Sequence, residues 1–525
     1  MSDGTSYWPR FVDDFLGRLE SDPGALSEGS RGLPAYRFDD ASERALLATR
    51  CRPVSFRLGT GASLFTDCLI PAMVSARSEI ILVTCFWAPS ESLTALHDAL
   101  TALAAHRRSL IRGALSRGDA AIRPLTVRIC LSSRSLLQKL LHPQSRGGYM
   151  YPPSAWEKQL GLPDPASLEA GGIQLQVKSL FFLPFSVMHP KFVIIDRQRA
   201  FVPSCNVSWE PWLEACVEIT GEAVRSLLVF YSRTWGDPPG SWQQVEPAPE
   251  GAATATEGVS LDARHAGLVV IQSPAHHRTA LRCREPVPTL VLPSSHHANP
   301  RFRPFPWQKP AAPPSTPQNI ALLQLFSRAQ QSIYIQTPNM TCRAVIAAVL
   351  DALARGVHVS IVTNRSMMLA EQLLTAGTTT SWCMWSLVRR FRRLRATADA
   401  RSAGDGGGGG DLEAGRPSIG RLQISYFRAK SRGGRELRET PQSLIRTPSR
   451  GEEPVHSHLK LTLVDDTYAV LGSANMDRAS WFTSQELSLL FHDRDLCTEI
   501  RSGIDSVLDG RVDLVFDSDD DVRAM

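Results

Sequence analysis

Two segments of the sequence place a histidine and a lysine at the start of a short apolar run that ends in an aspartate. The segments are MHPKFVIID, residues 188–196, and SHLKLTLVD, residues 457–465. Side chains alternate along a strand, so His189 and Lys191 share one face, and so do His458 and Lys460. The apolar residues that follow predict a strand running into the core, with its polar pair at the mouth.

Further polar residues follow the two histidines at matching distances. An aspartate comes 7 residues after each histidine, a serine 15 and an asparagine 17, and a glutamate comes 29 after the first and 28 after the second. These residues are Asp196, Ser204, Asn206 and Glu218 in the first copy, and Asp465, Ser473, Asn475 and Glu486 in the second. Two copies of a purely structural strand would share apolar positions but would not need to share these polar types. The repeat therefore indicates a functional site.

The residue types point to phosphodiester chemistry. Lysine ammonium and asparagine amide groups are donors suited to phosphate oxygens. Imidazole titrates near neutral pH, so one histidine can act as nucleophile while the other is the general acid. This requires both copies to meet in a single site, where a glutamate beside each imidazole would orient it. The two aspartates lie at the far ends of their strands and are predicted to be structural. No metal ligand set and no cofactor are expected, because no acidic cluster has metal-binding spacing.

Both halves of the chain alternate helical periodicity with short runs rich in valine and isoleucine. The pattern is helix then strand over 63–87, helix over 92–108 and strand over 126–133; in the second half it is helix then strand over 319–339, helix over 343–356 and strand over 357–364. Such alternation is typical of βαβ units. We predict an α/β fold with two similar α/β/α lobes, related as an internal pseudo-twofold repeat, each with a mixed, largely parallel sheet.

Segments rich in proline and glycine divide the chain. The predicted parts are an N-terminal extension (1–54), a first lobe (55–235), a Pro-rich connector (236–318), a second lobe (319–500) with a flexible basic insertion (397–455), and a C-terminal tail (501–525). Because each half carries half of the proposed site, the chain is expected to act as a monomer.

Composition describes a soluble globular protein, with 43% hydrophobic and 21% charged residues among 525. The net charge of +5 comes from one segment, since residues 386–450 hold 15 Lys and Arg against 6 Asp and Glu. The ten cysteines form no Cys-x-x-Cys pair, and the N-terminus has no apolar signal core. A cytoplasmic location is expected, with peripheral attachment to an intracellular membrane.

The motifs HPKFVIID…SCN and HLKLTLVD…GSANMD resemble the paired HKD motifs of the phospholipase D superfamily. The segments YIQTPN and ALARGVHVSIVT are most similar to cardiolipin synthases and related bacterial-type phospholipases. The resemblance implies metal-independent, ping-pong phosphodiester cleavage through a phosphohistidine. It implies that His189 and His458 are nucleophile and acid/base, with His189 favoured as nucleophile. The implied supporting residues are Lys191, Lys460, Asn206 and Asn475 for phosphate binding, Ser204 and Ser473 for site support, and Glu218 and Glu486 for orienting the histidines.

The substrate class remains open at the level of sequence. Residues 382–396, WCMWSLVRRFRRLRA, place Trp382, Trp385, Val388 and Phe391 at helical spacing among five arginines. This pattern fits a basic helix on an anionic phospholipid membrane surface, a core helix with a solvated face, or a contact with nucleic acid. We expect phospholipase D-type cleavage of glycerophospholipid head groups. The alternatives are a phosphatidyltransferase resembling cardiolipin synthase and a metal-independent nuclease; a non-enzymatic lipid-binding protein is disfavoured because both motifs keep their reactive residues.

Overall fold

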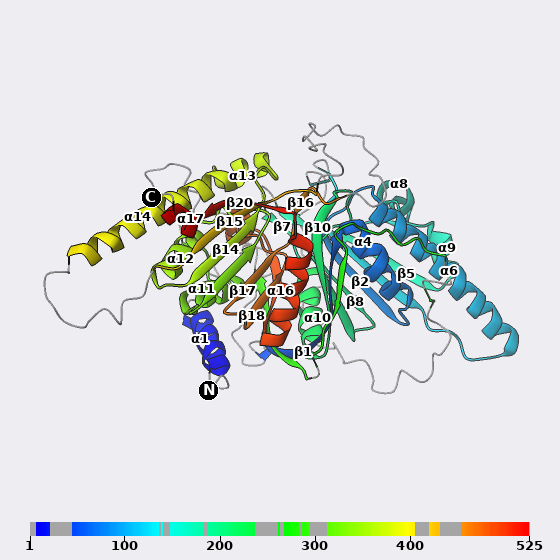
Figure 1. Ribbon diagram of the computed structural model, residues 1–525. Coiled ribbons are helices and arrows are strands. Elements are labelled where there is room, and N and C mark those ends of the chain that lie inside the picture. The colour runs from blue at the N-terminus through cyan, green and yellow to red at the C-terminus, as the bar shows by residue number, and fades with distance from the viewer. Residues whose placement is uncertain are drawn as a thin grey trace.

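The computed structural model places two similar lobes side by side (Figure 1). It describes residues 7–21, 45–135, 138–139, 148–182, 186–236, 261–262, 267–283, 285–294, 312–404, 419–430 and 453–523. Within these ranges, no helix combines the length and the apolar character needed to cross a bilayer.

The first lobe contains a mixed sheet whose strands follow an order set by their pairings. That order is β5 (Ile173–Ser179), β3 (Leu125–Ser133), β2 (Glu79–Phe86), β8 (Phe192–Ile195), β9 (Arg199–Pro203), β10 (Trp212–Thr220) and β1 (Ala48–Thr60). The short strand β4 (Tyr149–Met150) pairs with β5, and β6 (Phe181–Phe182) pairs with β7 (Ser186–Val187) as a separate hairpin. The strands β5, β3 and β2 are parallel, and the remaining neighbours pair antiparallel.

The second lobe repeats this order strand for strand. Its strands are β15 (Leu422–Phe427), β14 (His358–Thr363), β13 (Ser332–Gln336), β17 (Leu461–Val464), β18 (Tyr468–Gly472), β19 (Glu486–His492) and β12 (Val287–Ser294), with β20 (Val512–Asp517) outside β15. The predicted α/β fold with two repeated lobes is confirmed. The parallel part of each sheet is confined to three strands, because tight turns after the motif strands allow only antiparallel pairing.

Two further pairings join the sheets of the two lobes. The start of β1 pairs antiparallel with β12, from Ala48 with Leu290 to Cys51 with Val287. The short strand β16 (His456–Ser457) pairs parallel with the start of β10. Apolar residues of both lobes, including Phe56, Leu290 and Leu490, belong to one continuous core. The lobes are therefore packed as a unit, which fixes the two motifs relative to each other.

Helices cover the sheets on both lobes (Figure 1). In the first lobe they are α4 (Gly61–Leu64), a π-helical turn (Phe65–Leu69), α5 (Ile70–Val74), α6 (Glu91–Arg117), α8 (Trp156–Leu160), α9 (Pro165–Ala170) and α10 (Glu222–Trp235). In the second they are α11 (Pro317–Arg328), α12 (Arg343–Ala354), α13 (Leu369–Ala376), α14 (Thr380–Gly404), α15 (Arg478–Phe482), α16 (Arg494–Leu508) and α17 (Ser518–Arg523). Good capping residues begin several of them, as where the side chains of Ser90, Thr316 and Asp493 each accept a backbone N–H.

Regular structure extends beyond the boundaries expected from composition. Helix α1 (Tyr7–Ser21), in the predicted extension, packs on the second lobe, where Gln324 Nε2 donates to the carbonyl of Phe11 at 2.8 Å. The predicted connector contains β12 and also β11 (His277–Ala280), which pairs with β1. The boundary at residue 500 falls inside α16, and β15 lies within the predicted insertion. The rest of that insertion, 405–418 and 431–452, lies outside the described residues.

The predicted apolar stripe of residues 382–396 does not form one face of α14. Phe391 is 2% exposed and packs in the core, whereas Trp382 is 62% and Trp385 48% exposed. The helix instead buries Cys383, Met384 and Leu387 together with Phe391. The core therefore takes a face adjacent to the predicted stripe, and the two tryptophans are left in solvent.

Candidate active site

The two motif histidines are fixed to the opposite lobe through the main chain. The N–H of His189 donates to the carbonyl of Gln485 at 3.0 Å, and the N–H of His458 donates to the carbonyl of Leu213 at 2.8 Å. Gln485 and Leu213 each directly precede a glutamate. The pairing of backbones thus brings each histidine next to a carboxylate from the other half of the chain.

Each imidazole contacts a buried glutamate of the opposite lobe. Nδ1 of His189 donates to Oε2 of Glu486 at 2.8 Å, and Nδ1 of His458 donates to Oε1 of Glu214 at 2.7 Å. This contact leaves Nε2 of each ring as the atom for chemistry, because the partner of one ring nitrogen sets the role of the other.

The two motif serines support these carboxylates. The hydroxyl of Ser473 donates to Oε2 of Glu486 at 2.5 Å, and the hydroxyl of Ser204 donates to Oε2 of Glu214. Each serine therefore stabilises the glutamate of its own lobe, and that glutamate orients the histidine of the other. The N–H of Ser204 donates to the carbonyl of Ala215 at 2.8 Å, and the N–H of Ser473 donates to the carbonyl of Leu487 at 3.0 Å.

The prediction that Glu218 orients a histidine is wrong, and Glu214 has that position. Glu218 lies one helical-turn length further along β10 and instead accepts from Arg199 Nη2 at 2.7 Å and from Ser55 Oγ at 3.1 Å. The spacing misled because α15 lies between Asn475 and Glu486, so this interval is 11 residues, whereas Asn206 and Glu214 are 8 apart. Aligning the strands β10 and β19 by their apolar residues would have matched Glu214 with Glu486.

Both motif lysines are buried under the histidines. Nζ of Lys191 donates to the carbonyl of His189 at 2.9 Å, and Nζ of Lys460 donates to the carbonyl of His458 at 2.6 Å. Their residues are 1% and 5% exposed. These contacts hold each ammonium group close to the backbone of its own histidine, as the shared strand face predicts.

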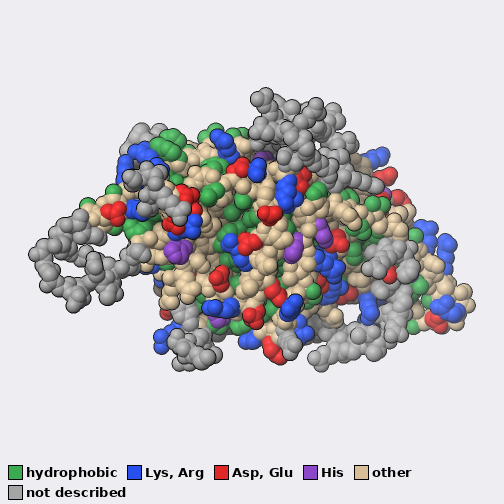
Figure 2. Space-filling view, in the orientation of Figure 1, with side chains coloured by type: hydrophobic (Ala, Val, Ile, Leu, Met, Phe, Trp, Pro, Cys, Tyr) green, Lys and Arg blue, Asp and Glu red, His purple; other side chains and the backbone are tan. Residues whose placement is uncertain are grey.

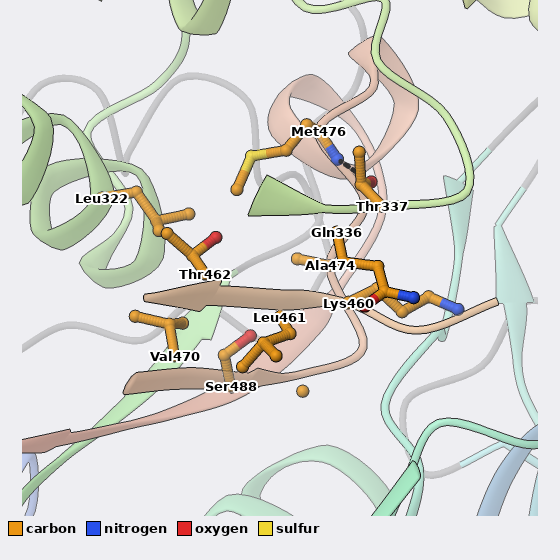
Figure 3. Close-up of a pocket in the computed structure, with 11 residues that line it drawn as sticks. Leu322, Gln336, Thr337, Lys460, Leu461, Thr462, Val470, Ala474, Met476 and Ser488 are labelled. Carbon is orange, nitrogen blue, oxygen red and sulfur yellow. Dashed lines mark hydrogen bonds between the residues drawn. The ribbon is translucent and has the colours of Figure 1, made fainter. Parts of the chain in front are cut away.

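A small cavity lies beside Lys460 on the core side of the second lobe (Figure 3). Its walls are mostly apolar, including Leu322, Val470 and Met476. Neither catalytic-motif histidine lines it. We assign it to packing between α11 and the sheet and not to substrate binding.

The two asparagines differ in their contacts. Oδ1 of Asn206 accepts from the N–H of Phe86 at 3.2 Å, which fixes the side chain at the end of β2. Nδ2 of Asn475 donates to Oδ2 of Asp477 at 3.0 Å. Among the described residues, Oδ1 of Asn475 and Oε1 of Glu486 are buried without a hydrogen-bond partner. Such buried polar atoms are expected where a polar ligand or water completes a site.

The two aspartates have the structural position expected of them. The carboxylate of Asp196 accepts from the backbone N–H groups of Arg77, Ser78 and Glu79, and that of Asp465 accepts from those of Gln330, Gln331 and Ser332. Both have positive φ, 51° and 52°, in the turns that follow β8 and β17. They tie each motif hairpin to the start of the neighbouring strand, away from the histidines.

Burial and charge strongly perturb the titration of the site. Burial lowers the pKa of His189, and burial with the nearby lysines holds the pKa of His458 well below its usual value. Burial also lowers the pKa of Lys460 to about 7 and raises that of Glu214 to about 7. Neutral imidazoles are therefore favoured at neutral pH, which is the form a nucleophile requires.

The two histidines are not equally accessible. The side chain of His189 is 14% exposed and that of His458 is 4% exposed. The indole of Trp212 covers His458, with ring centroids 4.8 Å apart. Nothing in the sequence motif distinguishes the two copies in this way, since Trp212 lies outside it.

A family model described as "Cardiolipin synthase, PLD-like domain" matches residues 322–508, which include the whole second motif and Glu486. The first lobe repeats the same strands and the same contacts. The chain belongs to the phospholipase D superfamily. No curated protein matches this phospholipase D superfamily sequence significantly.

Solved structures similar to this phospholipase D superfamily member share little sequence with it. Phosphatidylserine synthase from Haemophilus influenzae Rd KW20 is 14% identical over 90% of this chain and 91% of its own, with a TM-score of 0.46. Polyphosphate kinase from Porphyromonas gingivalis is 11% identical over 83% of this chain and 44% of its own, with a TM-score of 0.38. Nuc from Salmonella typhimurium, described as a phospholipase D family member, is 14% identical over 37% of this chain and 89% of its own, with a TM-score of 0.23.

Among the described residues, no group of three or more His, Cys, Asp or Glu side chains is arranged to hold a metal ion. The residues brought together are thus two imidazoles, two ammonium groups, two carboxylates and two amides. They can bind an anion and move protons to and from its substituents.

Proposed function

We propose that this protein is a phosphodiesterase that acts on the head-group phosphodiester of glycerophospholipids through a phosphohistidine. The observation that carries the proposal is the reciprocal pairing of His189 with Glu486 and of His458 with Glu214 across the lobe interface. It supplies two imidazoles oriented through Nδ1, with two buried lysines beside them. One imidazole for attack and one for proton transfer are what a double-displacement reaction needs.

In the first step, Nε2 of His189 attacks phosphorus and the bond to the leaving alcohol breaks. His458 gives a proton to that alcohol, so a P–N bond replaces a P–O bond. In the second step, His458 takes a proton from water or a second alcohol, whose oxygen attacks phosphorus and releases His189. Water gives hydrolysis and an alcohol gives phosphatidyl transfer.

The greater exposure of His189 supports its assignment as nucleophile. Attack requires direct access to phosphorus, and the His189 side chain is 14% exposed against 4% for His458. His458, enclosed by Trp212 and its own lysine, is better suited to proton transfer over a short distance. Lys191, Lys460 and the amides of Asn206 and Asn475 would stabilise the negative charge on the phosphoryl oxygens.

A glycerophospholipid is favoured over a nucleic acid by the family model, whose description names cardiolipin synthase. The apolar segment before His189 gives weaker support, because Leu180 and Phe181 are buried and residues 183–185 lie outside the described ranges. A phosphatidyltransferase and a nuclease are the competing activities. We further propose action as a monomer on the surface of a membrane facing the cytoplasm.

The test is to offer the purified protein mixed phospholipid vesicles, with and without glycerol, and single- and double-stranded oligonucleotides. We expect head-group release from the lipid, with a transfer product when an alcohol is present and no product from His189→Ala. Oligonucleotide cleavage without lipid turnover would replace this proposal with the nuclease. No turnover of any phosphodiester would remove the enzymatic assignment.

A further inference from the structure

Exposed apolar side chains concentrate on one part of the second lobe. Thirteen large hydrophobic residues are exposed in the described part of the chain, and five of them lie between positions 369 and 385. They are Leu369 (41%), Leu373 (55%), Leu374 (60%), Trp382 (62%) and Trp385 (48%), on α13 and the first turns of α14. We call them the α13–α14 patch. Hydrophobic side chains gather over these helices in the space-filling view (Figure 2).

Arginines continue the same face of α14. Trp382, Trp385, Arg389 and Arg393 follow one another at intervals of 3, 4 and 4 residues, so they lie along one side of the helix. The guanidinium of Arg389 lies over the Trp385 ring, 4.5 Å from its centroid. Positions 365–395 contain six arginines and a single acidic residue, Glu371. The patch therefore joins an apolar surface to a positively charged one.

The α13–α14 patch is attached to the candidate active site by buried hydrogen bonds. Gln372, on the inner side of α13, donates from Nε2 to Oδ1 of Asn339 at 2.9 Å and accepts from the N–H of Thr380 at 2.6 Å. Asn364, just before α13, donates to the carbonyl of Ser457 at 2.7 Å. Ser457 directly precedes His458, so the patch has a fixed position relative to the catalytic histidine.

A second link runs through the asparagine of the motif. Arg478, three residues after Asn475, donates from Nη1 to the carbonyl of Thr375 near the end of α13 at 3.3 Å. Helix α13 also packs against α15, which begins at Arg478. A surface held by α13 would therefore be held close to the phosphate-binding residues.

We propose that the α13–α14 patch is the surface that seats this protein on an anionic lipid bilayer. The leucines and tryptophans would enter the interfacial region, and Arg389 and Arg393 would contact lipid phosphates. Tryptophan favours the membrane interface, and arginine adds an attraction to anionic lipid that an apolar protein partner would not supply. The proposal rests on the proposed phospholipid substrate, which it would deliver at the edge of the site.

The test compares two surface variants that keep every buried contact of α13. The patch variant carries Leu373→Ser, Leu374→Ser, Trp382→Ser and Trp385→Ser. The matched control carries Leu115→Ser and Val270→Ser, which are exposed by 74% and 54% in the first lobe. Binding is measured by sedimentation with phosphatidylcholine vesicles containing or lacking phosphatidylglycerol.

We expect the patch variant to bind anionic vesicles at least about 10-fold more weakly than the control, because four interfacial side chains are lost. Wild-type binding should fall as salt rises, since charge attraction is screened. Equal binding by the patch variant and wild type would overturn the proposal. Conversion of a wild-type dimer to a monomer by the patch changes would also overturn it, because the patch would then be an interface between two copies.

Turnover separates this proposal from the proposed function. On a short-chain phospholipid below its critical micelle concentration, the patch variant should match wild type, while on vesicles its rate should fall with its binding. Vesicle binding that depends on the patch, without lipid turnover by wild type, would keep the docking surface and reject the phospholipase activity. Turnover of both substrates by the patch variant at wild-type rates would reject the docking surface alone.

Discussion

Oε2 of Glu486, in the second lobe, lies 2.8 Å from Nδ1 of His189, in the first lobe. The reverse contact joins Glu214 of the first lobe to His458 of the second. Neither lobe therefore contains an oriented histidine of its own. A duplicated motif becomes one site because the carboxylates are exchanged across the interface.

Replacing either histidine by alanine should lower turnover by at least about 1,000-fold, because attack and proton transfer work as a unit. His458→Ala should still accumulate a phosphorylated protein on a substrate with a good leaving group, since attack by His189 then needs no acid. Mass spectrometry of the trapped protein checks the assignment. Label on His458 in His189→Ala, with none on His189 in His458→Ala, would reverse the two roles.

The pair Glu214→Gln and Glu218→Gln tests which glutamate serves His458. Glu214→Gln should lower kcat by about 10- to 1,000-fold, because glutamine cannot stabilise the charged imidazole. Glu218→Gln should keep kcat and lose at most about 1 kcal/mol of stability, since the partner Arg199 is 41% exposed. Steady-state kinetics with urea unfolding distinguishes the two effects. Equal loss of kcat in both variants would contradict the geometry.

The pH profile of kcat/KM should be a narrow bell centred near pH 7. Glu214 has a pKa of about 7 and, once protonated at lower pH, cannot act as a charged partner for His458. Lys460 also has a pKa of about 7 and loses its positive charge as the pH rises. Lys460→Arg, which stays charged, should extend activity to alkaline pH. The measurement uses a soluble phosphodiester from pH 5.5 to 9, and a flat wild-type profile would oppose the prediction.

Asp465→Ala should lower the free energy of unfolding by about 2–4 kcal/mol, because three backbone N–H groups lose a charged acceptor. Asp465→Asn keeps an acceptor and tolerates the positive φ of 52°, so its loss should be smaller. Chemical unfolding measures both, and kcat per folded molecule should stay near wild type. A large fall in kcat with unchanged stability would instead place Asp465 in the chemistry.

The sequence by itself determined the repeated motif, the α/β class and the residues with phosphate chemistry. The two histidines, lysines, serines and asparagines could be recognised because strand geometry gives these residue types a fixed spacing along the chain. The turn aspartates could be predicted as structural for the same reason, since parity along a strand sets which face a side chain takes.

The tertiary structure decided what depends on distant segments meeting. The identity of the second glutamate could not come from spacing, because α15 lengthens one copy and only strand pairing aligns Glu214 with Glu486. The exchange of carboxylates between lobes and the covering of His458 by Trp212 depend on the interface. The exposure of Trp382 and Trp385 was likewise set by which face of α14 the core buried, and helical periodicity within one segment does not fix that choice.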